Sequence, residues 1–494
     1  MFLVFVWAAP VNGQDIESMR REFERFKADQ ERSMSDYKER NKRSMDSLRD
    51  AANRAFAAFL KETWEYKKTL RNDPPYQKPK PEDPPRIPGS DTPVNPVVPA
   101  PPKRNDPKPE DPAPPKPSPA GSNLARLAER EYGAALTLRP HTYYGQDTRL
   151  PDLRSSWPKI NRPVREESVT EYWNACTKVI QQKHVDILNL HRVALDLNDW
   201  AFQDLVRQWG EMNFSNATDR ELFIWFMLIQ HEYDVRLFYY QDAINLGYRM
   251  NRILYGLPYF EVEGKNYSII RSATNQVYTY PKQHGIAKKE FKLERISATG
   301  LQGETAFRAF RFKHQNNDVV INLPYDRNRL LLFKELPQTE LQFYLGEPGH
   351  PDFLAALHQQ VDPYLRNLTS DVAKVRFLHA MVTYSIPYQT DEEQFGREKF
   401  CLPEETLAYP YADCEDRANL LGLLVRELTG LKVASLHYPG HLALAVEIPG
   451  APADMYRLNH NGRQYVYCDP TYFGADIGMI PASYRNVTPV MYTP

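Results

Sequence analysis

The chain has 494 residues, which is long enough for two or three domains. Hydrophobic residues make up 42% of it and aromatic residues 12%, which is enough for substantial hydrophobic cores. Its formal net charge of -1 excludes a general electrostatic attraction to nucleic acid or to an anionic membrane, so no nucleic-acid partner is expected.

The first residues, "MFLVFVWAAPVNGQD", are apolar and then become small and polar. This pattern resembles the end of a secretory signal peptide at residues 1–13, although a basic start is missing. No later apolar run approaches the ~20 residues that a membrane-spanning helix needs. We therefore expect an exported protein that is periplasmic, extracellular or at the cell surface, with no transmembrane segment.

Residues 14–71 are charged and free of proline and glycine, which predicts a long helix. Apolar residues recur in it at spacings of three and four, as in an imperfect coiled coil, so self-association through this helix is one possible role. An exposed single helix is the alternative. The apolar positions are Ile16, Met19, Phe23 and Phe26, and then Met45, Leu48, Ala52, Ala55 and Phe59.

Residues 72–122 are dominated by proline, and the words "RNDP" and "KPEDP" each occur twice. Proline cannot donate a backbone hydrogen bond or continue a helix, so such a segment builds no packed core. We expect a proline-rich linker that separates the N-terminal helix from the globular part.

The sequence from about residue 124 onward is globular and mixes helical with strand patterns. Residues 164–212 have helical periodicity, residues 258–345 alternate as strands do, residues 352–385 return to helix, and strands recur after 431. A β-rich connecting region is expected at 286–345. The fold class predicted from these patterns is α+β.

The four cysteines are Cys176, Cys401, Cys414 and Cys468. In an exported protein two of them could form a disulfide, and Cys401 with Cys468 is the natural pair if Cys414 is reactive. Their spacings fit no common zinc pattern, and no metal or other cofactor is expected.

Cys414 lies in "YADCEDRANLLGLLVREL", where acidic residues precede a clean apolar periodicity. This pattern places the cysteine at or near the start of a helix, where backbone N–H groups and the helix dipole favour a thiolate. The acids Asp413, Glu415 and Asp416 oppose that effect. A histidine base would therefore have to contribute much of the activation that a nucleophilic cysteine needs.

His441 follows the turn "YPG" and opens the half-buried strand "HLALAVEI", and Asp469 ends the next strand, "NGRQYVYCDPTY". On antiparallel neighbours the two side chains can lie together, so that the carboxylate orients the imidazole while the imidazole takes the thiol proton. Cys468 faces the other side of its strand and is expected to be structural. A lone cysteine in an apolar helix is usually a core residue, but the order helix-cysteine, strand-histidine, strand-aspartate is more specific.

The stretches "DCEDRANLLGLLVREL", "YPGHLALAV" and "CDPTY" resemble the transglutaminase-like superfamily of papain-type cysteine enzymes. "IPYQTDEEQFGREKF" and "LPEETLAYPYADCEDR" are similar to a secreted group of that superfamily from Bacteroidetes-type bacteria. The resemblance covers roughly residues 340–494 and implies a catalytic domain at 346–494. The family commonly has glycine where this chain has Ala412.

The resemblance implies that Cys414 is the nucleophile, His441 the general base and acid, and Asp469 the residue that orients the histidine. Gln389 or Tyr388 is the candidate oxyanion donor. The implied function is an enzyme that acts on amide or peptide bonds of a protein or peptide substrate through a thioester, with hydrolysis favoured. The alternatives are a protein cross-linking transglutaminase and a non-catalytic surface scaffold or binding protein.

An earlier part of the chain parallels the catalytic motifs. "DRELFIWFMLIQHEYDVRL" parallels "DRANLLGLLVRELTGLKVASL" at an offset of 197 residues, and "EGKNYSIIRSATNQVYTYP" parallels "NGRQYVYCDPTYFGADIGMIP" at an offset of 198. Ala217 takes the cysteine position, Asp242 or Ala243 the histidine position and Arg271 the aspartate position. We expect an inactive transglutaminase-like domain at 160–285; two unrelated helix–strand units are the alternative, and a different strand order would exclude the repeat.

Overall fold

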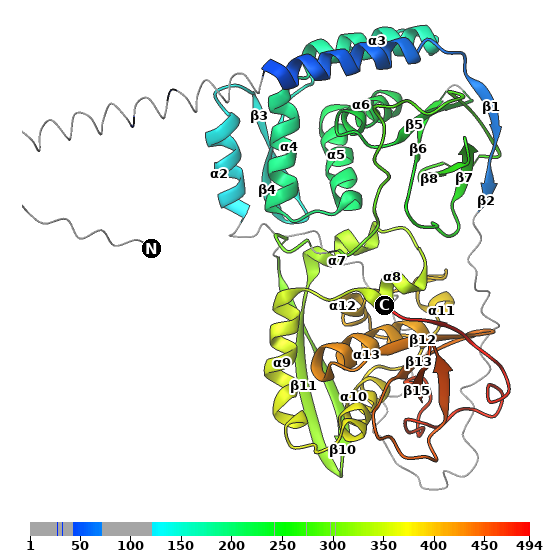
Figure 1. Cartoon of the computed structure of the whole chain (residues 1–494). Helices are drawn as coiled ribbons and strands as arrows, with labels where there is room; N and C mark the ends of the chain where they lie inside the picture. The colour runs from blue at the N-terminus through cyan, green and yellow to red at the C-terminus, as the bar shows by residue number, and fades with distance from the viewer. Residues whose placement is uncertain are drawn as a thin grey trace, which may run out of the picture.

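The computed structural model describes residues 27, 32, 43–71 and 121–494, except 242, 273, 297 and 302, and these residues form a mixed α and β protein (Figure 1). The expected signal peptide and all but the last two residues of the expected proline-rich linker lie outside the described residues. Within the described ranges, no helix combines the length and the apolar character that crossing a membrane requires.

The N-terminal unit consists of helices that pack against an antiparallel sheet. Its helices are α2 (Gly121–Tyr132), α3 (Glu166–Val179), α4 (Gln182–Ala194), α5 (Asp199–Asn213) and α6 (Ala217–Gln230). A hairpin, β3 (Leu138–Tyr143) and β4 (Gln146–Pro151), packs on α2, and the main strands are β5 (Val235–Tyr240), β6 (Ala243–Tyr248), β7 (Pro258–Val262), β8 (Lys265–Ile269) and β9 (Gln276–Thr279). The fully buried indoles of Trp173, Trp209 and Trp225 form the centre of its core.

The segment before the proline-rich stretch is part of this unit, and it is not a separate stalk. Residues 43–59 are helical and run alongside α3 (Figure 1, blue). Phe56 is 3% exposed, and its ring lies 4.5 Å from that of Trp173. Of the expected apolar stripe, Met45, Leu48 and Ala55 are exposed, and Ile16, Met19, Phe23 and Phe26 lie outside the described residues.

Residues 65–71 are strands, which corrects the expectation of helix up to residue 71. β1 (Glu65–Lys68) pairs with β9, and β2 (Leu70–Arg71) pairs with β7, so one extended stretch bonds to both edges of the sheet. The edges of a sheet offer unpaired N–H and C=O groups, and hydrogen bonding to these groups outweighs the local helical pattern here. The proline-rich stretch therefore lies between β2 and α2, which both belong to the N-terminal unit. The expectation that it separates a helix from the globular part is wrong.

The expected β-rich region at 286–345 is only partly β. It holds one antiparallel hairpin, β10 (Thr305–His314) with β11 (Asn317–Asp326), followed by helices α7 (Arg327–Lys334) and α8 (Leu341–Gly346). The run "LLLFKEL" was expected as strand but begins inside α7, because the Asp326 side chain accepts hydrogen bonds from the N–H groups of Asn328 and Arg329 and starts a helix. The hairpin packs on α9 (Pro351–Leu365) and α10 (Asp371–Ser385), and so belongs to the C-terminal unit.

The C-terminal unit has a long buried helix packed on a second antiparallel sheet (Figure 1, yellow to red). Two short helices, α11 (Asp391–Phe395) and α12 (Pro403–Thr406), precede the long helix α13 (Cys414–Thr429). The strands are β12 (Val433–Tyr438), β13 (His441–Val446), β14 (Arg457–His460), β15 (Arg463–Cys468) and β16 (Val490–Tyr492).

The two sheets share one topology. The five strands of the C-terminal sheet run in the order β14-β15-β13-β12-β16, and the corresponding strands of the N-terminal sheet run in the order β7-β8-β6-β5-β9. Val235 pairs with Tyr248 in the first sheet, and Val433 pairs with Val446 in the second, so the central hairpins also share their register at an offset of 198. Helix α6, which precedes the first sheet, begins at Ala217, as α13 begins at Cys414.

Candidate active site

Cys414 is the first residue of α13, with Asp413 as the N-cap, and it is 3% exposed. The position gives its sulfur the N-terminal end of a helix dipole. Its thiol donates a hydrogen bond to Oε2 of Glu415, with 2.9 Å between the heavy atoms. The neighbouring Asp413, Glu415 and Asp416 are buried as well, so the helix start is strongly acidic.

His441 and Asp469 lie together, each nearly buried. Nε2 of His441 is 2.6 Å from Oδ2 of Asp469. The same carboxylate accepts from the hydroxyl of Tyr467 at 2.8 Å and from the backbone N–H of Thr471 at 2.9 Å, while Nε2 of His379 donates to the Asp469 carbonyl at 2.8 Å. Burial alone would raise the pKa of Asp469, but the charge of His441 and the hydrogen bonds from His441 and Thr471 hold the pKa below its usual value.

Two tyrosines pack against the histidine. The ring of Tyr484 stacks on His441 at 5.2 Å and 16° between planes, and the ring of Tyr472 lies 5.5 Å from it. The pKa of both phenols is raised, chiefly by burial, with further contributions from negative charge at Asp469 and Cys414. The charge of Cys414 thus acts on the same two phenols whose rings lie beside the imidazole.

The candidate oxyanion donors follow α10 and run beside the segment that leads into Cys414. Tyr388 forms an isolated parallel bridge with Ala412, and the Ala412 N–H donates to the Pro387 carbonyl at 3.2 Å. Gln389 is half-buried one position further along. Both candidates are thus tied through the backbone to the residues just before the nucleophile.

Several residues of this site were missed by the sequence reasoning, although two had a readable signal. Tyr467 lies on β15 two positions before Asp469, which directly follows the strand, and side chains two apart in extended chain share a face. Thr471 follows Asp469 in "DPT", a pattern typical of an aspartate that binds a backbone N–H two residues on. Nothing in the sequence pointed to Tyr472, Tyr484 or His379, whose contacts depend on the tertiary fold.

The acidic residues around Cys414 include two groups whose oxygens lie within 4.8 Å of one another, and which could hold a metal. Oxygen ligands of this kind suit a hard cation such as Ca²⁺ or Mg²⁺ and not Zn²⁺. Some of these oxygens already accept backbone hydrogen bonds: Oδ2 of Asp391 from Lys399, and Oδ1 of Asp416 from Cys401. The groups are Asp391, Asp413 and Asp416, and Asp391, Glu398 and Glu415.

No disulfide joins the four cysteines, all of which are buried. The candidate pairing of Cys401 with Cys468 is therefore not formed in this structure. Cys401 faces Lys399, whose Nζ is 3.5 Å from its sulfur, whereas Cys468 lies in the main core, and burial raises the pKa of both thiols. Neither has the environment of a reactive cysteine.

The corresponding positions of the N-terminal unit carry no such chemistry. Ala217 is exposed at the start of α6, and Ala243 takes the register position of His441. Arg271, in the place of Asp469, forms an ion pair with Glu221 at 3.1 Å. Asp242, the other candidate for the histidine position, lies outside the described residues.

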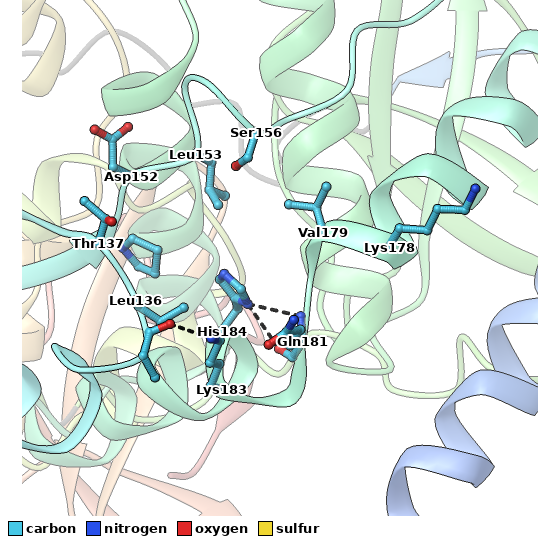
Figure 2. A pocket seen from close by; sticks show the side chains of 12 residues that line it. Leu136, Thr137, Asp152, Leu153, Ser156, Lys178, Val179, Gln181, Lys183 and His184 are labelled. Carbon is cyan, nitrogen blue, oxygen red and sulfur yellow. Dashed lines mark hydrogen bonds between the residues drawn. The ribbon is translucent and has the colours of Figure 1, made fainter.

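The N-terminal unit does contain a surface pocket of about 400 Å³, bordered by the residues after α2, by the end of β4 and by the turn between α3 and α4 (Figure 2). Nδ1 of His184 lies 3.1 Å from the backbone nitrogen of Gln181 and 3.3 Å from the Gln181 carbonyl oxygen. Burial lowers the pKa of His184 to about 4, so the ring is neutral at pH 7. No lining residue comes from an element that carries Cys414, His441 or Asp469.

Comparison with known proteins assigns no family: no family model matches the chain, and no curated protein matches it.

Proposed function

We propose that the C-terminal unit is a transglutaminase-like, papain-type cysteine enzyme that cleaves amide bonds. One observation carries this proposal: the imidazole of His441 is bonded at 2.6 Å to the buried carboxylate of Asp469, in the same unit whose long helix begins at Cys414. A histidine that served only as a core residue would need neither an ionised partner nor a carboxylate held by two further donors.

The contacts support the following reaction. Because Asp469 occupies Nε2 of His441, Nδ1 is the nitrogen left to take the proton from the Cys414 thiol. The thiolate attacks the substrate carbonyl, and the tetrahedral intermediate collapses to a thioester as the imidazolium returns its proton to the departing amine. A water molecule, deprotonated by His441, then attacks the thioester and releases the acid and the free thiol.

Hydrolysis fits the surroundings better than cross-linking. Cys414 is 3% exposed and His441 5%, and the rings of Tyr472 and Tyr484 pack against the histidine. A water molecule reaches such an enclosed thioester more easily than a lysine of a second protein does. The cross-linking enzyme remains the second candidate because the same three residues serve both reactions.

We further infer that residues 160–285 are an inactive copy of the C-terminal fold. The shared strand order and hairpin register support this. So does a side-chain contact: Arg220 donates to the Ser215 carbonyl as Arg417 donates to the Ala412 carbonyl, both at an offset of 197. A non-catalytic scaffold would explain the first unit but not the intact triad residues of the second.

Two assays on the whole protein test the enzyme. Unfolded casein reports hydrolysis as new amino termini, and incorporation of a biotinylated alkylamine into casein reports cross-linking. Cys414→Ala should abolish the activity, and Cys176→Ala, a buried cysteine of the other unit, should retain it. Amine incorporation without new termini would favour the transglutaminase, and no activity of either kind would favour the scaffold.

We also propose that the protein is exported, on the basis of the apolar run at 1–13. Expression with its own N-terminus and sequencing of the mature protein test this. A chain that begins near residue 14 outside the cytoplasm is expected, and an uncut intracellular chain would contradict the proposal.

A further inference from the structure

Arg417 is fully buried on α13, one turn after Cys414. Its guanidinium donates three hydrogen bonds, each to a different segment of backbone. Nε donates to the Ala412 carbonyl at 3.2 Å, Nη1 to the Pro470 carbonyl at 2.9 Å, and Nη2 to the Ile386 carbonyl. A planar guanidinium holds its donors in a fixed fork, so these bonds set the three segments relative to one another.

Each of the three segments carries one part of the proposed active site. Ala412 lies two positions before Cys414, Pro470 directly follows Asp469, and Ile386 lies two positions before Tyr388. The rings of Tyr388 and Phe473 lie 5.4 and 5.7 Å from the guanidinium carbon. Filling this buried space does not by itself require an arginine, because an apolar side chain would fill it at a lower desolvation cost.

We propose that Arg417 is a positioning residue, whose guanidinium fixes the nucleophile, the orienting aspartate and the oxyanion segment relative to one another. This inference rests on the proposed function. Burial lowers the pKa of Arg417 to about 10, which leaves it charged at neutral pH. That charge also favours the thiolate of Cys414, offsetting the acids at the start of the helix.

The N-terminal unit offers an internal comparison. Arg220 occupies the matching position on α6, and among the described residues its side chain makes one hydrogen bond, to Ser215 at 2.9 Å. In the part of the chain that the structure describes, Arg220 makes no counterpart of the two bonds by which Arg417 reaches the aspartate and oxyanion segments. The bonds of Arg417 to the Pro470 and Ile386 carbonyls thus occur in the unit with the proposed active site and are not required by the shared fold.

The test is the pH dependence of Cys414 alkylation by iodoacetamide in the full chain, measured for wild type, Arg417→Lys and Arg417→Gln. Lysine keeps the charge but loses the fork, and glutamine loses the charge and all but one or two donors. We expect alkylation at pH 6 to slow about tenfold in both, as for a shift of one pKa unit, and the midpoint of the profile to rise. Arg220→Lys and Arg220→Gln are the matched controls and should leave the profile unchanged.

The outcomes separate the two proposals. Ordinary slow alkylation of the wild-type thiol would remove the proposed function itself. A fast wild type with unchanged profiles in folded Arg417 variants would overturn only the positioning role and leave Arg417 as a structural residue. If neither variant folds, Phe473→Leu removes one ring beside the guanidinium; a smaller shift in the same direction is expected, and an unchanged profile would contradict the inference.

Discussion

Glu415 accepts the hydrogen bond of the Cys414 thiol, at 2.9 Å between Oε2 and Sγ, and this contact opposes ionisation of the sulfur. A thiolate at that distance would face a buried carboxylate of the same sign. In the proposed reaction the thiol must therefore turn from Glu415 to His441 before it loses its proton.

Replacement of this acid should activate the cysteine. Glu415→Gln keeps the shape of the side chain and removes the negative charge, so we expect Cys414 to alkylate about tenfold faster at pH 7. The measurement is the rate of iodoacetamide labelling, read by mass spectrometry of the Cys414 peptide. An unchanged rate would mean that the carboxylate does not oppose ionisation of the thiol, and a slower rate would mean that it assists it.

Asp469 is held by His441, Tyr467 and Thr471, which makes its orienting role testable. Asp469→Asn keeps the size of the group but no longer stabilises the imidazolium, and we expect amide hydrolysis to fall by on the order of 10³-fold. The thermal midpoint of the variant serves as the control for folding. Retention of near wild-type hydrolysis in a folded variant would exclude the triad.

Asp469 and Glu347 impose opposite pH dependences on stability. The folded-state pKa of Asp469 is lowered, so its contribution is present above the unfolded pKa of about 4 and is lost as the pH falls through the folded value. Burial raises the pKa of Glu347 to about 7, so its contribution is complete below the unfolded pKa and is lost as the pH rises toward 7.

The second effect gives a measurable prediction. Between pH 5 and pH 8 the wild type should lose on the order of 2–3 kcal/mol of unfolding free energy through Glu347. Glu347→Gln should flatten that slope, because glutamine does not ionise and its amide oxygen can still accept from the Ile296 N–H. Urea unfolding at several pH values is the measurement, and equal slopes in both proteins would contradict the raised pKa.

At the scale of elements, the N-terminal helix is a packed part of the first unit. Phe56→Ala removes a ring that contacts Trp173 and Trp225, and we expect a loss of about 3–5 kcal/mol in unfolding free energy. Met45→Ala, on the same helix but 63% exposed, should change it by less than about 0.5 kcal/mol. Denaturant unfolding measures both, and a small effect of Phe56→Ala would mean that the helix is detached.

The helix also bears on self-association. Met45 and Leu48 are more than half exposed and could meet a second copy, whereas Phe56 is committed to the core of its own unit. Any pairing of two chains through this segment would therefore have to use the earlier part of the helix.

Local pattern predicted the elements that carry the proposed chemistry. Helix α13 and strands β13 and β15 were readable because apolar spacing, turn residues and burial all agree there. The strands at 65–71 could not be predicted from local pattern, because they form by pairing with the two edges of a sheet whose strands lie far along the sequence. The helix at 327–334 was missed because its residues have a strand-like pattern. The helix cap formed by Asp326 outweighs their strand propensity.

Side-chain contacts were predictable only in part. The strand order implied the meeting of His441 and Asp469, whereas the hydrogen bond from Cys414 to Glu415 depends on a rotamer that sequence does not specify. The three carbonyls around Arg417 come from segments up to 84 residues apart, between Ile386 and Pro470, and no spacing in the sequence connects them.

At the scale of the whole molecule, two units share a sheet topology and only one carries the reactive set. The second unit differs in the segment between β15 and β16, which holds Tyr472 and Tyr484 and covers the histidine. The segment between β8 and β9 in the first unit is much shorter. The first unit thus lacks both the triad residues and the longer segment that covers the histidine in the second unit. This is expected if that segment takes part in the proposed reaction.

The account depends on activation of Cys414 by His441, and the rate of Cys414 alkylation between pH 5 and pH 9 tests it most directly. The full chain is compared with His441→Ala, and with a chain in which Ala217→Cys is combined with Cys414→Ala as a matched thiol at the other helix start. We predict rapid alkylation of Cys414 below pH 7 in the wild type, lost in His441→Ala, with the cysteine at position 217 titrating near the ordinary value of about 8.5. Equal, slow alkylation of Cys414 with and without His441 would contradict the account.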